Sequence, residues 1–229
     1  IGYKGKKLTK SDCEKIISDL EDEKKIKFYY ELLQFKELNN FLISGDTNFF
    51  YNYQEKAILK NVLFLEFISP YFANQYDGII LKIYVSSDEN LLKRILSLKP
   101  LVISNYIDSC YKSLYNYFKQ QVQELELLHR QIRNEEIDED ELNDNDIIKK
   151  IIQKIKIKQI NYLPEYFSSI KNQIAKSIRD LSVAIFNTFD NSKLSFNLIE
   201  EALKIKIDDL NRRKFTEDYK KIKEINDDR

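Results

Sequence analysis

The stretch that decides the fold runs over residues 101–133 and reads LVISNYIDSCYKSLYNYFKQQVQELELLHRQIR. Apolar side chains recur in it mostly at intervals of three or four residues, which places them on one face of an α-helix. These side chains are Tyr111, Tyr115, Phe118, Val122, Leu125 and Ile132. We therefore predict one long helix over this stretch, packed as an arm of an antiparallel hairpin within the chain. An intermolecular coiled coil is the alternative use of the same seam.

Helical patterns continue on both sides of this stretch. Ser11 and Glu14 fit a capping box, which predicts the start of a first helix. Its apolar stripe comprises Cys13, Ile16, Ile17 and Leu20. A second helix is predicted over residues 23–43, and its expected inner face comprises Ile26, Tyr29, Tyr30, Leu33 and Leu38. Further helices are predicted over residues 53–69 (ended by Pro70), 88–98, 147–160, 162–189 and 194–205. A last helix is predicted after a break at residues 207–209 and runs to about residue 225, while residues 79–85 suit either a helix or a short strand.

Composition excludes several classes of protein. The chain has 229 residues, with 37 basic and 37 acidic side chains, so no net charge favours a polyanion or a membrane surface. Four scattered glycines cannot form a phosphate-binding loop, and one histidine cannot build a histidine-rich metal site. Cys13 and Cys110 lack C-x-x-C spacing and read as reduced core residues. With no predicted signal peptide or membrane span, we expect a cytoplasmic protein.

The sequence divides into three regions by composition. Residues 1–133 form an aromatic-rich helical region, since 21 of the 29 Phe and Tyr residues lie before residue 121. Residues 134–146 carry eight carboxylates and no basic side chain, which predicts a solvated acidic loop or a frayed helix end. Residues 147–229 are predicted to be a region of helical hairpins. The expected fold is all-α, with antiparallel helical hairpins and a repeat-like C-terminal part.

No pattern supports catalysis or metal binding. Glu126 and His129 have the Glu-x-x-His spacing of di-iron bundles, but such a site needs a second copy of the motif. Asp138, Asp140 and Asp144 supply oxygen ligands for calcium, but the glycine that an EF-hand loop requires is absent. We therefore expect no catalytic residue, no cofactor and no metal.

One basic segment supports an alternative function. Five lysines alternate with isoleucines just after the acidic region, and they are Lys149, Lys150, Lys154, Lys156 and Lys158. Lysines on one helix face neutralise nucleic-acid phosphates, and the nearby Tyr162, Tyr166 and Phe167 could stack on bases. The adjacent acidic residues and the zero net charge weigh against this interpretation.

A helical hairpin near the C-terminus carries a family resemblance. Leu181, Ser182 and Ala184 in a first helix, Asp190 in the turn and Ala202 in a second helix resemble a degenerate tetratricopeptide repeat over residues 181–206. Ser195 departs from that pattern, because it stands where the family has a first alanine of the second helix. The resemblance implies a helical-hairpin array that binds peptides or proteins, with no catalytic residue.

The expected function follows from these points. We predict a non-catalytic helical protein-interaction or scaffold module, part of a larger protein or complex, with a protein partner. A nucleic-acid-associated helical protein, using the basic segment 149–158, is the alternative. An enzyme that works through carboxylates alone is the third class, and no cleft is evident in the sequence for it.

Overall fold

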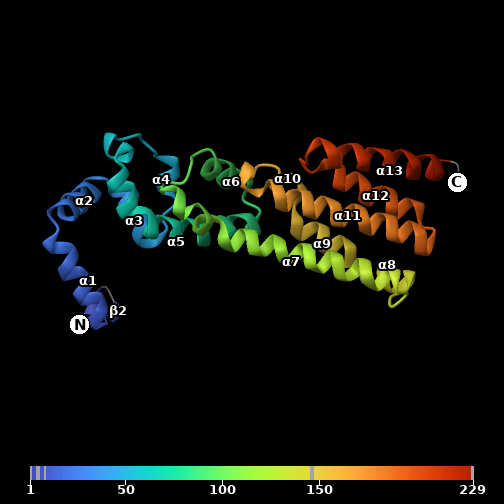
Figure 1. The fold of residues 1–229 in the computed structure, drawn as a ribbon, viewed down its shortest axis with the longest axis horizontal. Coiled ribbons are helices and arrows are strands. Elements are labelled where there is room, and N and C mark those ends of the chain that lie inside the picture. Colours follow the sequence, from blue (N-terminus) through green and yellow to red (C-terminus); the bar gives the residue numbers. More distant parts are fainter. Residues whose placement is uncertain (1, 4–5, 8, 145–146, 228–229) are drawn as a thin grey trace. The chain divides into compact units, whose positions relative to one another are not determined.

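The fold is all-α, as the sequence predicts. The computed structural model describes residues 2–3, 6–7, 9–144 and 147–227. The chain divides into two compact units, one of residues 1–79 and 97–111 and the other of residues 80–96 and 112–229. Figure 1 labels the helices in chain order, and their bounds are as follows. They are α1 (Lys10–Glu21), α2 (Glu23–Gln34), α3 (Lys36–Ser44), α4 (Asn48–Tyr51), α5 (Val62–Ser86), α6 (Glu89–Leu96), α7 (Ile107–Arg133), α8 (Glu139–Asp144), α9 (Ile147–Ile155), α10 (Ile157–Ile160), α11 (Ser168–Phe189), α12 (Ser192–Lys204) and α13 (Asp209–Asp227).

A small hairpin precedes the first helix. Strands β1 (Gly2–Tyr3) and β2 (Lys6–Lys7) pair antiparallel, with Gly2 opposite Lys7. The sequence pattern predicts no helix or strand at this point.

Helix α5 runs through Pro70, although the sequence predicts a helix end there. Proline removes one hydrogen bond inside a helix, at a cost of about 3 kcal/mol. Here the helix buries a continuous apolar face around the proline, including Ile68 and Phe72, which offsets that cost. The fully buried Ser69 also donates to the carbonyl of Leu65 and accepts from the amide of Ile103. Residues 79–85, for which the sequence allows a helix or a strand, lie inside the same helix.

Aromatic side chains form the core of the first unit. Phe41 contacts the rings of Phe49, Phe50 and Phe72, and all four are buried. Phe35 also inserts into this core, and its backbone leaves the helical region between α2 and α3. The single helix predicted over residues 23–43 is therefore two helices, because burying Phe35 requires a bend.

The long helix predicted from residues 101–133 begins six residues later, at Ile107. Residues 104–106 form a 3-10 turn instead. The amide of Ile103 is already bonded to the Ser69 hydroxyl, at 2.9 Å, so this segment is held by a side chain of α5. From Ile107 onward the prediction holds, since five of the six seam residues are buried and Tyr115 is half-buried.

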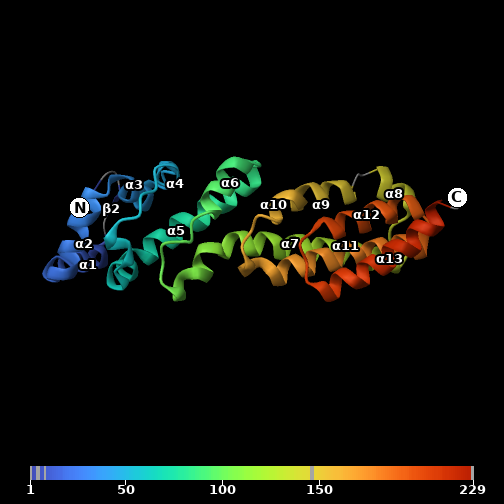
Figure 2. The ribbon, with the colours of Figure 1, turned by 90° about the horizontal axis from the view of Figure 1, so that it is seen from above.

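Helices α11, α12 and α13 lie side by side in the second unit (Figures 1 and 2). Asp190 ends α11 in the left-handed conformation, at φ 55°, and Asn191 then caps α12 by accepting from the amide of Leu194. Leu181, Ala184 and Ala202 are buried, as the hairpin pattern predicts.

Two segments before this hairpin differ from the expectation. The helix predicted over residues 147–160 breaks at Lys156, which has a φ of 49° and separates α9 from α10. Within the acidic region, the Asp138 amide donates to the Glu141 carboxylate and the Glu141 amide donates to the Asp138 carboxylate, and these two bonds start the short helix α8. Leu142 of α8 is buried, so this region is more than a solvated loop. Across the described residues, every helix is too short or too polar to cross a membrane.

Candidate protein-interaction surface

The N-cap of helix α1 lies two residues earlier than the sequence predicts. Thr9, not Ser11, is the N-cap, and Thr9 and Asp12 form the capping box. The Thr9 amide donates to the Asp12 carboxylate at 2.8 Å, and the Asp12 amide donates to the Thr9 hydroxyl at 3.1 Å. These bonds hold the pKa of Asp12 below its ordinary value. The cap determines where the helix begins. The contacts that hold α1 against the rest of the first unit lie further along the helix.

Helix α1 is attached to the first unit through its polar side. Asp19 is its buried residue, at 7% exposure, and it accepts from the ammonium of Lys25 at 2.6 Å and from the hydroxyl of Tyr29 at 3.2 Å. The bond from Lys25 holds the pKa of Asp19 below its ordinary value. One turn earlier, the ammonium of Lys15 lies 5.9 Å from the ring centre of Tyr71.

The apolar stripe of α1 faces solvent. Ile17 and Leu20 are each 58% exposed, and Ile16 is 44% exposed. At about 100° per residue, Lys15 lies roughly 160° around the helix from Ile17, so the attached side and the apolar side are opposed. The spacing leads us to expect that Ile16 is buried in a helix–helix contact, and that expectation is wrong. The stripe exists as predicted, but the chain does not cover it.

Helix α2 repeats this pattern in a weaker form. It packs through Phe28, which lies 5.5 Å from the ring of Phe64, and through the buried Leu32. Within α2 the predicted inner face is turned away from the core: Tyr30 is 62% exposed, Leu33 is 69% exposed, and Ile26 is also exposed. Leu38 of the same predicted face lies in α3 and is buried as predicted. Tyr29 lies at the edge of this face, where burial together with Tyr71 and Asp19 raises its pKa to about 12.

We call the six most exposed large apolar side chains of these two helices the N-terminal apolar surface. They are Ile16, Ile17, Leu20, Ile26, Tyr30 and Leu33. The two helices are joined by the single residue Asp22, which ends α1 and caps α2 by accepting from the amides of Lys24 and Lys25. The ribbon turns at this point (Figure 1). Folding two helices back on each other takes a loop of two to five residues, so α1 and α2 cannot cover each other's stripes.

The five lysines of the basic segment are placed separately. Lys149, Lys150 and Lys154 belong to α9, Lys156 lies at the break, and Lys158 belongs to α10. They therefore do not form one continuous helix face.

Three of these lysines are held by groups of the second unit. Lys154 pairs with Glu124 at 2.9 Å, and Lys158 pairs with Glu89 at 2.9 Å. Lys156 donates to the carbonyl of Tyr84 at 2.8 Å and to the carbonyl of Val85, at the C-terminal end of α5. Burial lowers the pKa of Lys156. Each of these ammonium groups would have to leave its partner, or share it, to bind a phosphate.

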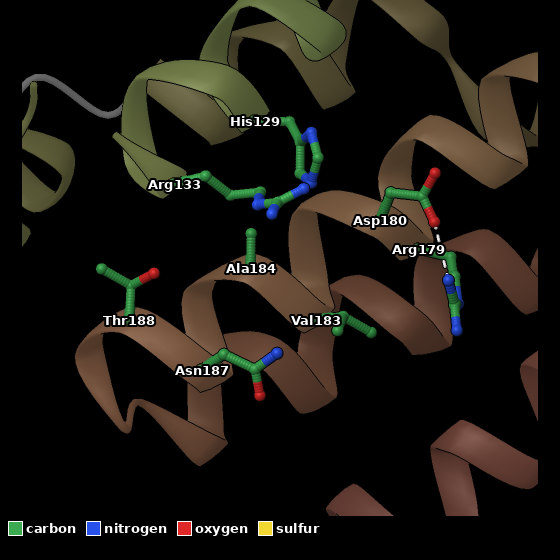
Figure 3. A pocket seen from close by; sticks show the side chains of 8 residues that line it. All are labelled: His129, Arg133, Arg179, Asp180, Val183, Ala184, Asn187 and Thr188. Atoms are coloured by element: carbon green, nitrogen blue, oxygen red, sulfur yellow. Dashed lines mark hydrogen bonds and ion pairs between the residues drawn. The ribbon is translucent and has the colours of Figure 1, made fainter. Parts of the chain in front are cut away.

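A polar groove lies between α7 and α11. Its volume is about 530 Å³, and it is lined by His129, Arg133, Arg179, Asp180, Val183, Ala184, Asn187 and Thr188. Figure 3 shows His129 and Arg133 projecting from α7 toward Ala184 of α11. The guanidinium group of Arg179 forms ion pairs with Asp180 and Asp218, each at 2.7 Å. Glu126 and His129 share a smaller adjoining pocket of about 180 Å³.

The groove offers no cluster of metal-binding side chains. Within the described part of the chain, no three His, Cys, Asp or Glu side chains gather as metal ligands. Both cysteines are unpaired, and burial raises the pKa of the Cys110 thiol to about 12.

The N-terminal apolar surface is the feature that sequence reasoning missed. The spacing of the apolar residues could locate each stripe, but only the contacts of Lys15 and Asp19 reveal that α1 is turned with that stripe outward. No protein-family model, curated protein or solved structure matches this chain.

Proposed function

We propose that this chain is a non-catalytic protein-interaction module that binds a protein through the N-terminal apolar surface. The observation that carries this function is the orientation of α1, which contacts its own unit through Lys15 and Asp19 and leaves Ile16, Ile17 and Leu20 in solvent.

The energetics of α1 support the proposal. A helix of 12 residues is marginal in water by itself, and most helical stability in proteins comes from burying an apolar face. In the free chain α1 buries Asp19 and no large apolar side chain. A partner that covers Ile17 and Leu20 would supply the missing stabilisation, at roughly 25 cal/mol per Å² of apolar surface.

The density of exposed apolar side chains supports it further. Single exposed apolar residues are ordinary on protein surfaces, whereas contiguous runs at helical spacing mark sites of interaction. Ile16, Ile17 and Leu20 stand at i, i+1 and i+4 on one helix, and Ile26, Tyr30 and Leu33 follow within 13 residues.

A matched pair of variants tests this function. Leu20→Asp places a charge in the N-terminal apolar surface, and Leu210→Asp places one on α13 at a leucine that is also well exposed. Each chain is tagged, expressed in cells with a second, differently tagged wild-type copy, and purified both with and without nuclease treatment.

We expect the wild type and Leu210→Asp to retain the same protein, either another polypeptide or the second copy, and Leu20→Asp to lose it. Equal retention by all three chains would contradict the proposal. The proposal would also be contradicted if only nucleic acid co-purified with the untreated chain and nuclease treatment removed it.

A further inference from the structure

We infer that the occupant of the N-terminal apolar surface is a second copy of this chain, with α1 of each copy packed on α2 of the other. This inference rests on the proposed function and names its partner. In such a two-fold arrangement both stripes of both copies are covered by the same contact made twice.

The connection at Asp22 is the first step of the argument. Helices α1 and α2 are each 12 residues long, and each carries an apolar stripe at i, i+3, i+4 and i+7. Such a pair is suited to pack together along its length, but one linking residue prevents this within a chain. The same pairing between two chains meets no such restriction.

Charge favours the crossed pairing of α1 with α2. Helix α1 has a net charge of −2, from Lys10 and Lys15 against Asp12, Glu14, Asp19 and Glu21. Helix α2 has a net charge of +1, from Lys24, Lys25 and Lys27 against Glu23 and Glu31. Packing α1 on the partner's α1 would set two acidic helices together, whereas packing it on the partner's α2 sets an acidic helix against a basic one.

The exposed area is adequate for a weak dimer. A fully exposed large side chain presents roughly 200 Å², so the six members of the surface, each between 44% and 69% exposed, present about 670 Å² per copy. Two copies would together bury about 1,300 Å², near the lower limit for a specific interface. We therefore expect reversible association with a Kd in the micromolar range.

Sedimentation equilibrium of the purified full chain tests the inference. We expect the wild type and Leu210→Asp to show the same monomer–dimer equilibrium, and Leu20→Asp and Leu33→Asp to weaken it at least tenfold. Circular dichroism of each variant reports whether its helices remain. A wild-type chain that stays monomeric at 200 μM, about a hundredfold above a low-micromolar Kd, would overturn the inference.

Charge exchange supplies a second test that leaves every apolar side chain in place. Glu14→Lys with Glu21→Lys makes α1 basic, and Lys24→Glu with Lys27→Glu makes α2 acidic. Each doubly substituted chain should dimerise more weakly than wild type, because like charges then face each other twice. A mixture of the two should dimerise as the wild type does, because both crossed contacts are restored in the mixed dimer.

A mixture that associates no better than its components would overturn the crossed arrangement.

The proposed function and the proposed second copy can be contradicted separately. If the wild type is monomeric while Leu20→Asp loses a different protein in the purification described above, the second copy is wrong and the interaction function stands. If Leu20→Asp changes neither measurement, both are wrong.

Discussion

Ser182 and Ser195 bond reciprocally across the hairpin of α11 and α12. The Ser182 hydroxyl donates to the carbonyl of Ser195 at 2.7 Å, and the Ser195 hydroxyl donates to the carbonyl of Ser182 at 2.8 Å. Both residues are fully buried. The small side chain that close helix packing requires is thus a serine at each position, and each hydroxyl finds its partner on the opposite helix. Ser195, the departure from the tetratricopeptide pattern, therefore has a structural role.

Substituting Ser195 should separate the effect of size from that of hydrogen bonding. We expect Ser195→Ala to lower the free energy of unfolding by about 0.5–1.5 kcal/mol, the usual net value of one hydrogen bond. Ser195→Leu should cost about 1–3 kcal/mol through overpacking against Ser182. Urea unfolding measures both. If Ser195→Leu were as stable as Ser195→Ala, the helices would not be in close contact at this point.

The ends of helices depend on contacts that spacing does not encode. The sequence predicts the body of α7 and the turn at Asp190. Both depend on local signals: the lack of glycine and proline within the helix, the helical spacing of apolar residues, and the turn-forming residues at its end. It misses the bend at Phe35 and the passage of α5 through Pro70, because both follow from burial among residues far along the chain.

The candidate surface shows the same division between local and tertiary signals. Periodicity locates the stripe of Ile16, Ile17 and Leu20 correctly. The side of α1 that faces the unit is decided by Asp19, which is buried against Lys25 and Tyr29. An isolated sequence does not reveal that a carboxylate will be the buried residue, since buried carboxylates depend on partners brought by the fold.

Lys156 should be important for stability. Its ammonium group donates to the carbonyls of Tyr84 and Val85 in the last turn of α5, where the helix leaves carbonyls without the usual intrahelical partner. The Tyr84 carbonyl also accepts from the amide of Ser87, at 3.3 Å. Hydrogen bonds to a charged group contribute about 1.5–3 kcal/mol, so we expect Lys156→Met to lower the free energy of unfolding by that amount. Lys150→Met, on the exposed side of α9, should change it by less than about 0.5 kcal/mol. Equal effects of the two substitutions in urea unfolding would contradict this assignment.

Lys171 should give the chain a pH-dependent stability above pH 8. It is buried and donates to the carbonyl of Leu163 at 2.7 Å, and burial, with Lys206 nearby, lowers its pKa to about 8 from 10.5. Between these two values the unfolded chain binds more protons than the folded chain, so stability rises with pH. Urea unfolding between pH 7.5 and 9.5 should show this rise in the wild type relative to Lys171→Met. Parallel pH profiles of the two chains would show that the amine titrates normally.

Glu89 should contribute stability that is lost in acid. Its carboxylate accepts from Lys93 at 2.7 Å, from Lys158 and from the hydroxyl of Tyr162, and these bonds lower its pKa to about 2 from 4.5. The folded chain therefore holds this proton less tightly than the unfolded chain, and the contribution present above pH 4.5 disappears as the pH falls toward 2. We expect acid unfolding of Glu89→Gln to lack this component, while Glu126→Gln, at an exposed carboxylate of α7, retains it. A wild-type acid transition unchanged by Glu89→Gln would rule out the effect.

Charge reversal on α9 decides between protein and nucleic acid as the partner. The triple change of Lys149, Lys150 and Lys154 to Glu should leave the helical circular dichroism intact, although it sets an acidic side chain against Glu124. Under the interaction function, a protein partner stays bound. Under the alternative, phosphate contacts and their released counterions are lost, so affinity falls and depends less steeply on salt.

Filter binding with single-stranded RNA and duplex DNA, at salt between 50 and 200 mM, makes the comparison. The control is the triple change of Lys220, Lys221 and Lys223 to Glu on α13, which alters the net charge equally. We expect weak binding that both triple variants reduce alike, because Lys154, Lys156 and Lys158 are already held by Glu124, by the end of α5 and by Glu89. If the α9 variant alone abolishes a salt-sensitive interaction, the basic segment is a nucleic-acid site and that function replaces the one proposed above.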